Sequence, residues 1–345
     1  MRSVYSLITL GMLFLALGAQ AQTSVGAAVP LSGPIAIMGQ AVQNGMVLYN
    51  EQAAREKQGA PLKYIFEDSR YDGKTALTIL NKFASVDKPK LAMVWGNTPS
   101  AAVASVAAQL NLPTVLISHE TYSTKYSNAV ELGPTSSSCL GVLQERVAQV
   151  GEERFGSIGI DVGNVVQFLD DLDSAVGKKL PREIVGADAS QFQVQLLKGK
   201  AKGITTYVVV LMPEQALILA RQAKELKLDI SIIGGDIFAD DEFLKKLSAV
   251  QPRTSLMYSP VQPWFAKAYR ERFKNTKYLL EASSGYVYGQ VAANFGQSSP
   301  GSSLQQVVQK MDLPSLAYNN AQLSEKGVRI SSPCALMTAE EYLAQ

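Results

Sequence analysis

The chain has very few residues of the kinds that build metal centres: one histidine and two cysteines among 345 residues. Zinc sites draw most of their ligands from these residue types, so a multi-ligand zinc site is nearly excluded. The net charge of +2 lacks the positive excess on which sequence-independent nucleic-acid binding depends. The hydrophobic content of 47% is too high for a disordered chain. We therefore expect a folded protein of two ordinary domains, with no metal, cofactor or nucleic acid bound.

Long hydrophobic runs are missing everywhere except near the N-terminus. Arg2 supplies a positive start, and the apolar run Leu7–Gly18 is too short for a stable transmembrane helix. Ala19-Gln20-Ala21 has the small residues that signal peptidase accepts. We predict a signal peptide over residues 1–21, a mature chain that begins at Gln22, and export to the periplasm. The alternative is a membrane anchor that stays attached.

Catalytic motifs are also missing. The sequence has no G-x-S-x-G elbow, no H-E-x-x-H and no C-x-x-C. Gly73-Lys74-Thr75 imitates the end of a phosphate-binding loop, but Asp68 stands where that motif requires its first glycine. These absences argue against an enzyme, although a hydrolase or isomerase stays open as an alternative.

The two cysteines allow only one intramolecular pairing, Cys139 with Cys334. Export would permit a disulfide, but bridging needs Cα atoms within about 7 Å, which sequence cannot show. Because cysteine often serves as a small core residue, we favour two buried free thiols over a bridge.

What the chain does have is a regular alternation of strand-like and helix-like segments. The continuous apolar run Thr206–Met212 is typical of a strand that is covered on both faces. The other expected strands are Ser24–Pro30, Leu62–Phe66, Leu91–Trp95, Thr114–Ser118, Ser157–Asp161, Glu183–Ala187, Ile230–Gly234, Ser255–Pro260 and Arg329–Thr338. This alternation predicts an α/β fold with parallel sheets. The strands are too many for one core, and the Gly/Pro/Ser cluster Leu132–Ser138 suits a linker.

The residues that follow these strands carry a family resemblance. The segments concerned are Val29–Pro34, Trp95–Ser100, Leu112–Ser118, Pro213-Glu214, Gly234–Asp236 and Leu323–Gly327. In this order they resemble the type I periplasmic binding proteins of ABC transporters, the branched-chain amino-acid-binding proteins. The resemblance implies two Rossmann-like lobes that are joined by three crossover strands and trap a ligand between them. It places one lobe at residues 22–136 plus 262–314 and the other at 137–261 plus 315–345.

The resemblance also assigns roles to the strand-end loops. Ser100, with Thr98 beside it, matches the residue that holds the ligand carboxylate at a helix N-terminus, where free N–H groups attract anions. The alternative is that Ser100 only caps the helix. In the next loop Ser118 and His119 are candidate contacts. Glu120 departs from the family, since it would repel a carboxylate, so either it points away or the ligand lacks a free carboxylate.

Three further residues define the opposite side and the walls of this expected site. Asp236 matches the acid that pairs with the ligand's ammonium in the family, although it could instead cap a helix or contact the hinge. Met38 and Met212 stand where the relatives carry aromatic residues. This exchange points to a larger or more apolar ligand than a small amino acid.

The predicted function is therefore capture of a small, amino-acid-like or more apolar solute for an ABC permease in the inner membrane. The protein is expected to be a monomer. The alternative is a periplasmic sensor or carrier module that binds an unusual, less polar ligand and has no role in transport.

Overall fold

The computed structural model describes residues 22–56, 61–122, 128–274 and 277–344. The predicted signal peptide lies outside these residues. The strands form two separate sheets. The first has the order β11 (Gln322–Leu323), β12 (Arg329–Ser331), β5 (Ala129–Leu132), β4 (Thr114–Ile117), β3 (Leu91–Trp95), β1 (Ser24–Val29) and β2 (Lys63–Asp68). The second has the order β13 (Ala335–Thr338), β10 (Thr254–Tyr258), β9 (Ser231–Gly234), β8 (Thr206–Val210), β6 (Phe155–Ile160) and β7 (Arg182–Val185).

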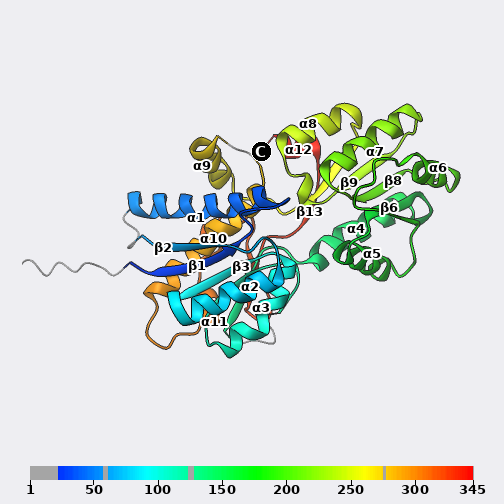
Figure 1. Ribbon diagram of the computed structural model, residues 1–345. Coiled ribbons are helices and arrows are strands. Elements are labelled where there is room, and N and C mark those ends of the chain that lie inside the picture. The colour runs from blue at the N-terminus through cyan, green and yellow to red at the C-terminus, as the bar shows by residue number, and fades with distance from the viewer. Residues whose placement is uncertain (1–21, 57–60, 123–127, 275–276, 345) are drawn as a thin grey trace, which may run out of the picture.

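Neighbouring strands are parallel throughout both sheets, except for the antiparallel pairs β11–β12 and β10–β13. Helices cover the faces of the sheets, as parallel strands require, because the strand connections have to cross over a face. The predicted α/β fold with two parallel-dominated sheets is confirmed. We call each sheet with its helices a lobe (Figure 1).

The first lobe carries α1 (Ala36–Glu56), α2 (Gly73–Lys82), α3 (Asn97–Gln109), α9 (Pro263–Phe273), α10 (Leu279–Gln297) and α11 (Leu304–Val308). The second carries α4 (Ser136–Val150), α5 (Gly163–Val176), α6 (Gln193–Ala201), α7 (Pro213–Glu225), α8 (Asp241–Val250) and α12 (Ala339–Leu343). Short helical turns complete the described chain: η1 (Phe83–Asp87), η2 (Glu152–Arg154), η3 (Asp236–Phe238) and η4 (Leu313–Ser315).

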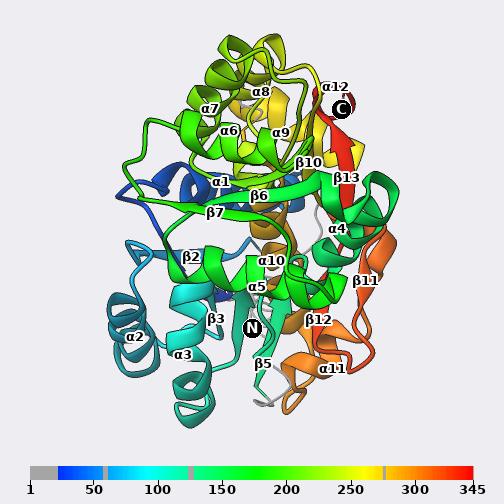
Figure 2. The ribbon, with the colours of Figure 1, turned by 90° about the vertical axis from the view of Figure 1, so that its right-hand side faces the viewer.

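The chain passes between the two sheets after β5, after β10 and after β12. Figure 2 faces the second lobe and shows the red C-terminal strand β13 beside β10. The exact lobe boundaries stay a prediction.

The C-terminal segment differs from the sequence-based expectation. A single strand over Arg329–Thr338 is wrong, because β12 pairs with β5 in the first sheet and β13 pairs with β10 in the second. Pro333 lies between them, and proline has no N–H to donate to a strand ladder. The segment is therefore a crossing between lobes.

The two cysteines form a disulfide, so the expectation of free thiols is wrong. Their Cα atoms lie 5.1 Å apart, within the ordinary range for a bridge. Cys139 lies in the first turn of α4, and Cys334 lies directly before β13. The bridge therefore ties together two segments that have just entered the second lobe.

No helix within the described ranges is long and apolar enough to span a bilayer.

Candidate functional site

The site is built from loops at the carboxyl ends of parallel strands, where open α/β sheets bind ligands. Asn97, at the start of α3, joins the first two loops: its Oδ1 accepts bonds from the Ser118 hydroxyl at 3.0 Å and the His119 N–H at 2.9 Å. The third loop comes from the other lobe. His119 Nε2 lies 3.6 Å from Asp236 Oδ2, which belongs to η3 after β9. The structure thus brings the three predicted loops together across the interface between the lobes.

A cavity of about 550 Å³ is lined from both lobes and includes Ile237, the residue that follows Asp236. The first lobe contributes the beginning of α1, including Met38, and the second contributes Met212 at the start of α7. The full lining is Pro34, Ile35, Ile37, Met38, Ala187, Asp188, Ala189, Ser190, Met212, Pro213, Glu214, Gln215, Ile218, Ile237 and Tyr278. Most of these side chains are apolar. The cavity can therefore hold an apolar body of moderate size.

The hydroxyls of Ser100 and Ser118, both predicted to contact the ligand, already have partners within the protein. Helix α3 begins at Asn97, so Ser100 lies inside its first turn and does not act as the cap. Ser100 is fully buried, and its hydroxyl faces the carbonyl oxygen of Val94 at 3.4 Å. Thr98 lies one residue after the start of α3 and is exposed.

Tyr71 reaches the same helix end from the loop after β2. Both Arg70 and Tyr71 have left-handed backbones, with φ of 51° and 58°. This turn lays the Tyr71 ring against Gly96, where an added Cβ would lie only 2.3 Å from Tyr71 Cε2. Burial raises the pKa of Tyr71, whereas the N–H groups of Asn97 and Thr98 and the Thr98 hydroxyl lower it. The Tyr71 ring thus lies against the residue that directly precedes α3.

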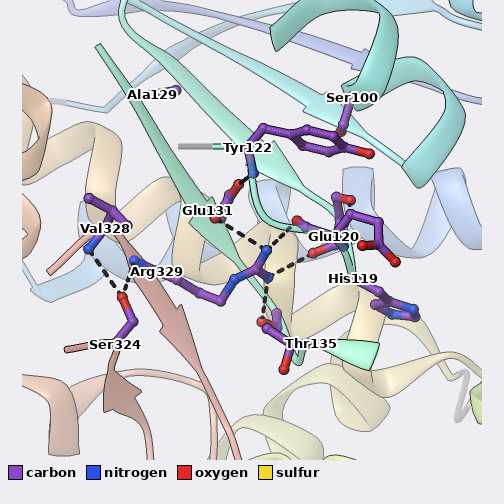
Figure 3. A network of polar contacts seen from close by, with 12 residues as sticks. Ser100, His119, Glu120, Tyr122, Ala129, Glu131, Thr135, Ser324, Val328 and Arg329 are labelled. Carbon is purple, nitrogen blue, oxygen red and sulfur yellow. Dashed lines mark hydrogen bonds and ion pairs between the residues drawn. The ribbon is translucent and has the colours of Figure 1, made fainter. Parts of the chain in front are cut away.

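Arg329, on β12, holds the loop that contains Glu120. Its guanidinium donates to the carbonyl oxygens of Ser118 at 2.7 Å and Gly133 at 3.0 Å, and to that of Glu120 (Figure 3). Glu131 Oε2 lies 3.2 Å from the guanidinium, and both side chains are buried. A buried pair of this kind depends on such extra hydrogen bonds, because both charges have lost their contact with water.

Only the backbone carbonyl of Glu120, and not its side chain, accepts a hydrogen bond from Arg329. The Glu120 side chain is exposed, and its Oε1 accepts a bond at 3.3 Å from the hydroxyl of Ser136, at the start of α4.

Asp236 does not cap α8, because that role belongs to Asp240, which accepts from the Phe243 N–H at 2.9 Å.

Glu281, on α10, is a buried acid close to Asp236. It is 4% exposed, and its Oε2 has no hydrogen-bond partner among the described residues. Burial and the charge of Asp236 raise its pKa to about 8. Sequence analysis did not identify Tyr71, Arg329 or Glu281, since all three come from segments that were not assigned to the site. For Glu281 the sequence does offer a signal of a functional role, because this acid stands among the apolar residues at the start of α10.

Comparisons with known proteins agree with this architecture. The profile of a family described as periplasmic binding protein matches residues 22–339. No curated protein matches the sequence.

Three solved structures have the same fold. The branched-chain amino acid transporter substrate binding protein LivJ of Streptococcus pneumoniae, in complex with isoleucine, has 17% identity and a TM-score of 0.78, over 92% of this chain and 96% of that chain. A solute binding protein of an ABC transporter from Rhodopseudomonas palustris BisB5, in complex with 3,4-dihydroxybenzoic acid, has 18% identity and a TM-score of 0.74, with 92% and 93% covered. A solute binding protein from R. palustris in complex with benzoate has 13% identity, a TM-score of 0.74 and the same coverage. The family profile spans most of the chain, and the protein belongs to the periplasmic binding protein family.

Proposed function

We propose that the protein is an exported solute-binding protein that captures a small ligand between its lobes and delivers it to an ABC permease in the inner membrane. The observation that carries this proposal is the cavity lined from both lobes, which includes Ile237 of the loop that carries Asp236. The LivJ protein and the two R. palustris proteins hold isoleucine or aromatic acids. Residues 1–21 serve as the cleaved signal peptide in this proposal.

The ligand site in this proposal comprises both sides of the interface. Its residues are Met38, Thr98, Ser100, Ser118, His119 and Glu120 from the first lobe and Met212 and Asp236 from the second. A ligand bound between these residues would contact both lobes only when they are closed. Binding would therefore shift the protein toward the closed form, which a permease can recognise.

Thermal unfolding with a panel of solutes tests the proposal. The panel should contain amines, carboxylates, amino acids and neutral compounds. A ligand at a hundred times its dissociation constant should raise the free energy of unfolding by about 2.7 kcal/mol. Each stabilising solute should then be incubated with the protein and analysed for products. Recovery of unchanged solute is expected, whereas turnover would replace the binding proposal with an enzymatic one.

A sensor or carrier without a transport role is the second candidate, because Met38 and Met212 give the cavity an apolar wall. Reconstitution with a permease and its ATPase separates the two. Transport requires that the ligand-loaded protein stimulate ATP hydrolysis, and a lack of stimulation by the loaded form would favour the second candidate.

A further inference from the structure

The N-terminus of α3 has few backbone N–H groups that could donate a hydrogen bond to a ligand. Pro99 has no N–H, and the Ser100 N–H already donates to the carbonyl oxygen of Gly96 at 2.9 Å. The N–H groups of Asn97 and Thr98 are left without partners inside the helix. These two groups, together with the helix dipole, would form the natural place for an anion.

Tyr71 occupies that place. Its ring is fixed between Gly96 and Trp95, with a centroid distance of 5.9 Å to the Trp95 ring. A ligand carboxylate could reach these donors only if the ring left this position.

The neighbouring donors on the first lobe are engaged as well. The Ser118 hydroxyl and the His119 N–H both donate to Asn97 Oδ1. The Ser100 hydroxyl is buried and faces Val94. A carboxylate entering here would lose its hydration without gaining hydrogen bonds.

The charges around the site are negative. The cavity lining contains Asp188 and Glu214, and none of the described residues in that lining is a Lys, Arg or His. Asp236 lies at the lobe interface, with the buried Glu281 behind it. His119 is the partner of Asp236, and their 3.6 Å separation is longer than a charge-assisted hydrogen bond. An ammonium group could therefore replace His119 as a closer partner.

We propose that the ligand of this site is an amine with an apolar body and no carboxylate, and that Tyr71 sets this specificity by occupying the start of α3. The inference rests on the proposed function. The ammonium binds Asp236, and the apolar body fills the cavity that Met38, Met212 and Ile237 line. A carboxylate would be repelled by Asp236, because unit charges of the same sign 4 Å apart oppose each other by about 4 kcal/mol near a protein surface.

Calorimetry with three matched probes tests the proposal: phenethylamine, L-phenylalanine and 3-phenylpropanoate. They share the phenyl body and differ in the charged groups they carry. The wild-type protein should bind phenethylamine at least about tenfold more tightly than phenylalanine, which is about 1.4 kcal/mol, and 3-phenylpropanoate most weakly. The variant Asp236→Asn should weaken phenethylamine binding by about tenfold or more.

Tyr71→Ala removes the ring from its place against Gly96 and Trp95, which opens the N–H groups of Asn97 and Thr98 to a ligand. Its affinity for phenylalanine should rise by about tenfold, whereas its affinity for phenethylamine should stay the same. Tyr64→Ala is the matched control: Tyr64 lies near the amino end of β2, at the opposite end of that strand from Tyr71, and the loss of its ring should change no affinity. Thermal melts establish that each variant is folded.

The outcomes separate the inference from the proposed function. Tighter binding of phenylalanine or 3-phenylpropanoate than of phenethylamine by the wild type overturns the amine proposal and leaves the proposed function intact. Stabilisation by isoleucine or benzoate but by no amine has the same meaning. An unchanged preference in Tyr71→Ala removes Tyr71 as the determinant. If no class of solute in the panel binds, the proposed function itself fails.

Discussion

Glu281 is a residue whose charge opposes folding. Its carboxyl group is buried in α10, and the groups that face it include Asp236 and the phenols of Tyr258, Tyr278 and Tyr318. Burial and Asp236 raise its pKa from 4.5 to about 8. Between these two values the folded protein holds a proton that the unfolded chain releases. The stability that comes from this group is therefore complete below about pH 4.5 and is lost as the pH rises toward 8.

The variant Glu281→Gln should remove this dependence on pH, because glutamine is uncharged in both states. The melting temperature of the wild type should fall relative to that of Glu281→Gln between about pH 5 and pH 8. Calorimetry at several pH values measures the difference. Glu145→Gln, which changes an exposed acid of α4, should follow the wild type. Parallel curves for the wild type and Glu281→Gln would contradict the assigned cause.

At the scale of elements, α1 and α10 pack with their backbones in close contact. An added Cβ on Gly45 would lie 1.8 Å from the carbonyl oxygen of Ala282, and one on Gly285 would lie 2.0 Å from that of Val42. Neither neighbour is the flexible end of a side chain. The two glycines therefore set the distance between the helices.

The variant Gly45→Ala should force the helices apart and lower the free energy of unfolding by about 1 to 3 kcal/mol or more. Gly141→Ala is the control, since Gly141 lies in α4 with open space around its Cβ position. Alanine has the higher helix propensity, so this change should raise stability by up to about 1 kcal/mol. Urea titration measures both effects. Equal responses of the two variants would show that the close approach of α1 and α10 is unimportant.

The elements were predictable where local signals are strong. Leu91–Trp95 was predicted with the bounds of β3, and all five of its residues are buried. The short strand β5 was missed, because it lies at the edge of the Gly/Pro/Ser cluster that suggested a linker. Pro333 gave a signal for the break in the last segment that the strand prediction did not use.

The site was predictable at the level of loops but not of individual contacts. The loops after β3 and β4 meet because parallel strands end on the same edge of their sheet. The loop after β9 belongs to the other sheet and meets them across the interface between the lobes. The positions of Tyr71 and Arg329 depend on other causes. Tyr71 reaches α3 through two left-handed residues, and Arg329 reaches the loop of Glu120 from a strand about 200 residues further along the chain. Neither local propensity nor spacing carries such information.

At the scale of the whole molecule, the disulfide closes a loop with a sequence separation of 195 residues. Without the bridge, the unfolded chain would have a much higher conformational entropy, which favours unfolding. The double variant Cys139→Ser, Cys334→Ser should lose about 2 to 4 kcal/mol of stability. Unfolding in urea measures this loss, and adding a reductant should weaken the wild type and leave the variant unchanged. A response of the variant to reductant, or equal stability of both proteins, would contradict a stabilising bridge.

The balance between open and closed lobes should depend on His119. Its contact with Asp236 joins the two lobes, but the side chains are 41% and 28% exposed. Partly exposed pairs contribute only about 0.2 to 1 kcal/mol, so His119→Ala should shift the open-to-closed ratio by roughly 1.4-fold to fivefold. In X-ray scattering, the ligand-free variant should have a larger radius of gyration than the wild type. Lys198→Ala removes an ion pair with Glu183 inside the second lobe and should leave the radius unchanged. An unchanged radius in His119→Ala would mean that the closed form depends on other contacts between the lobes.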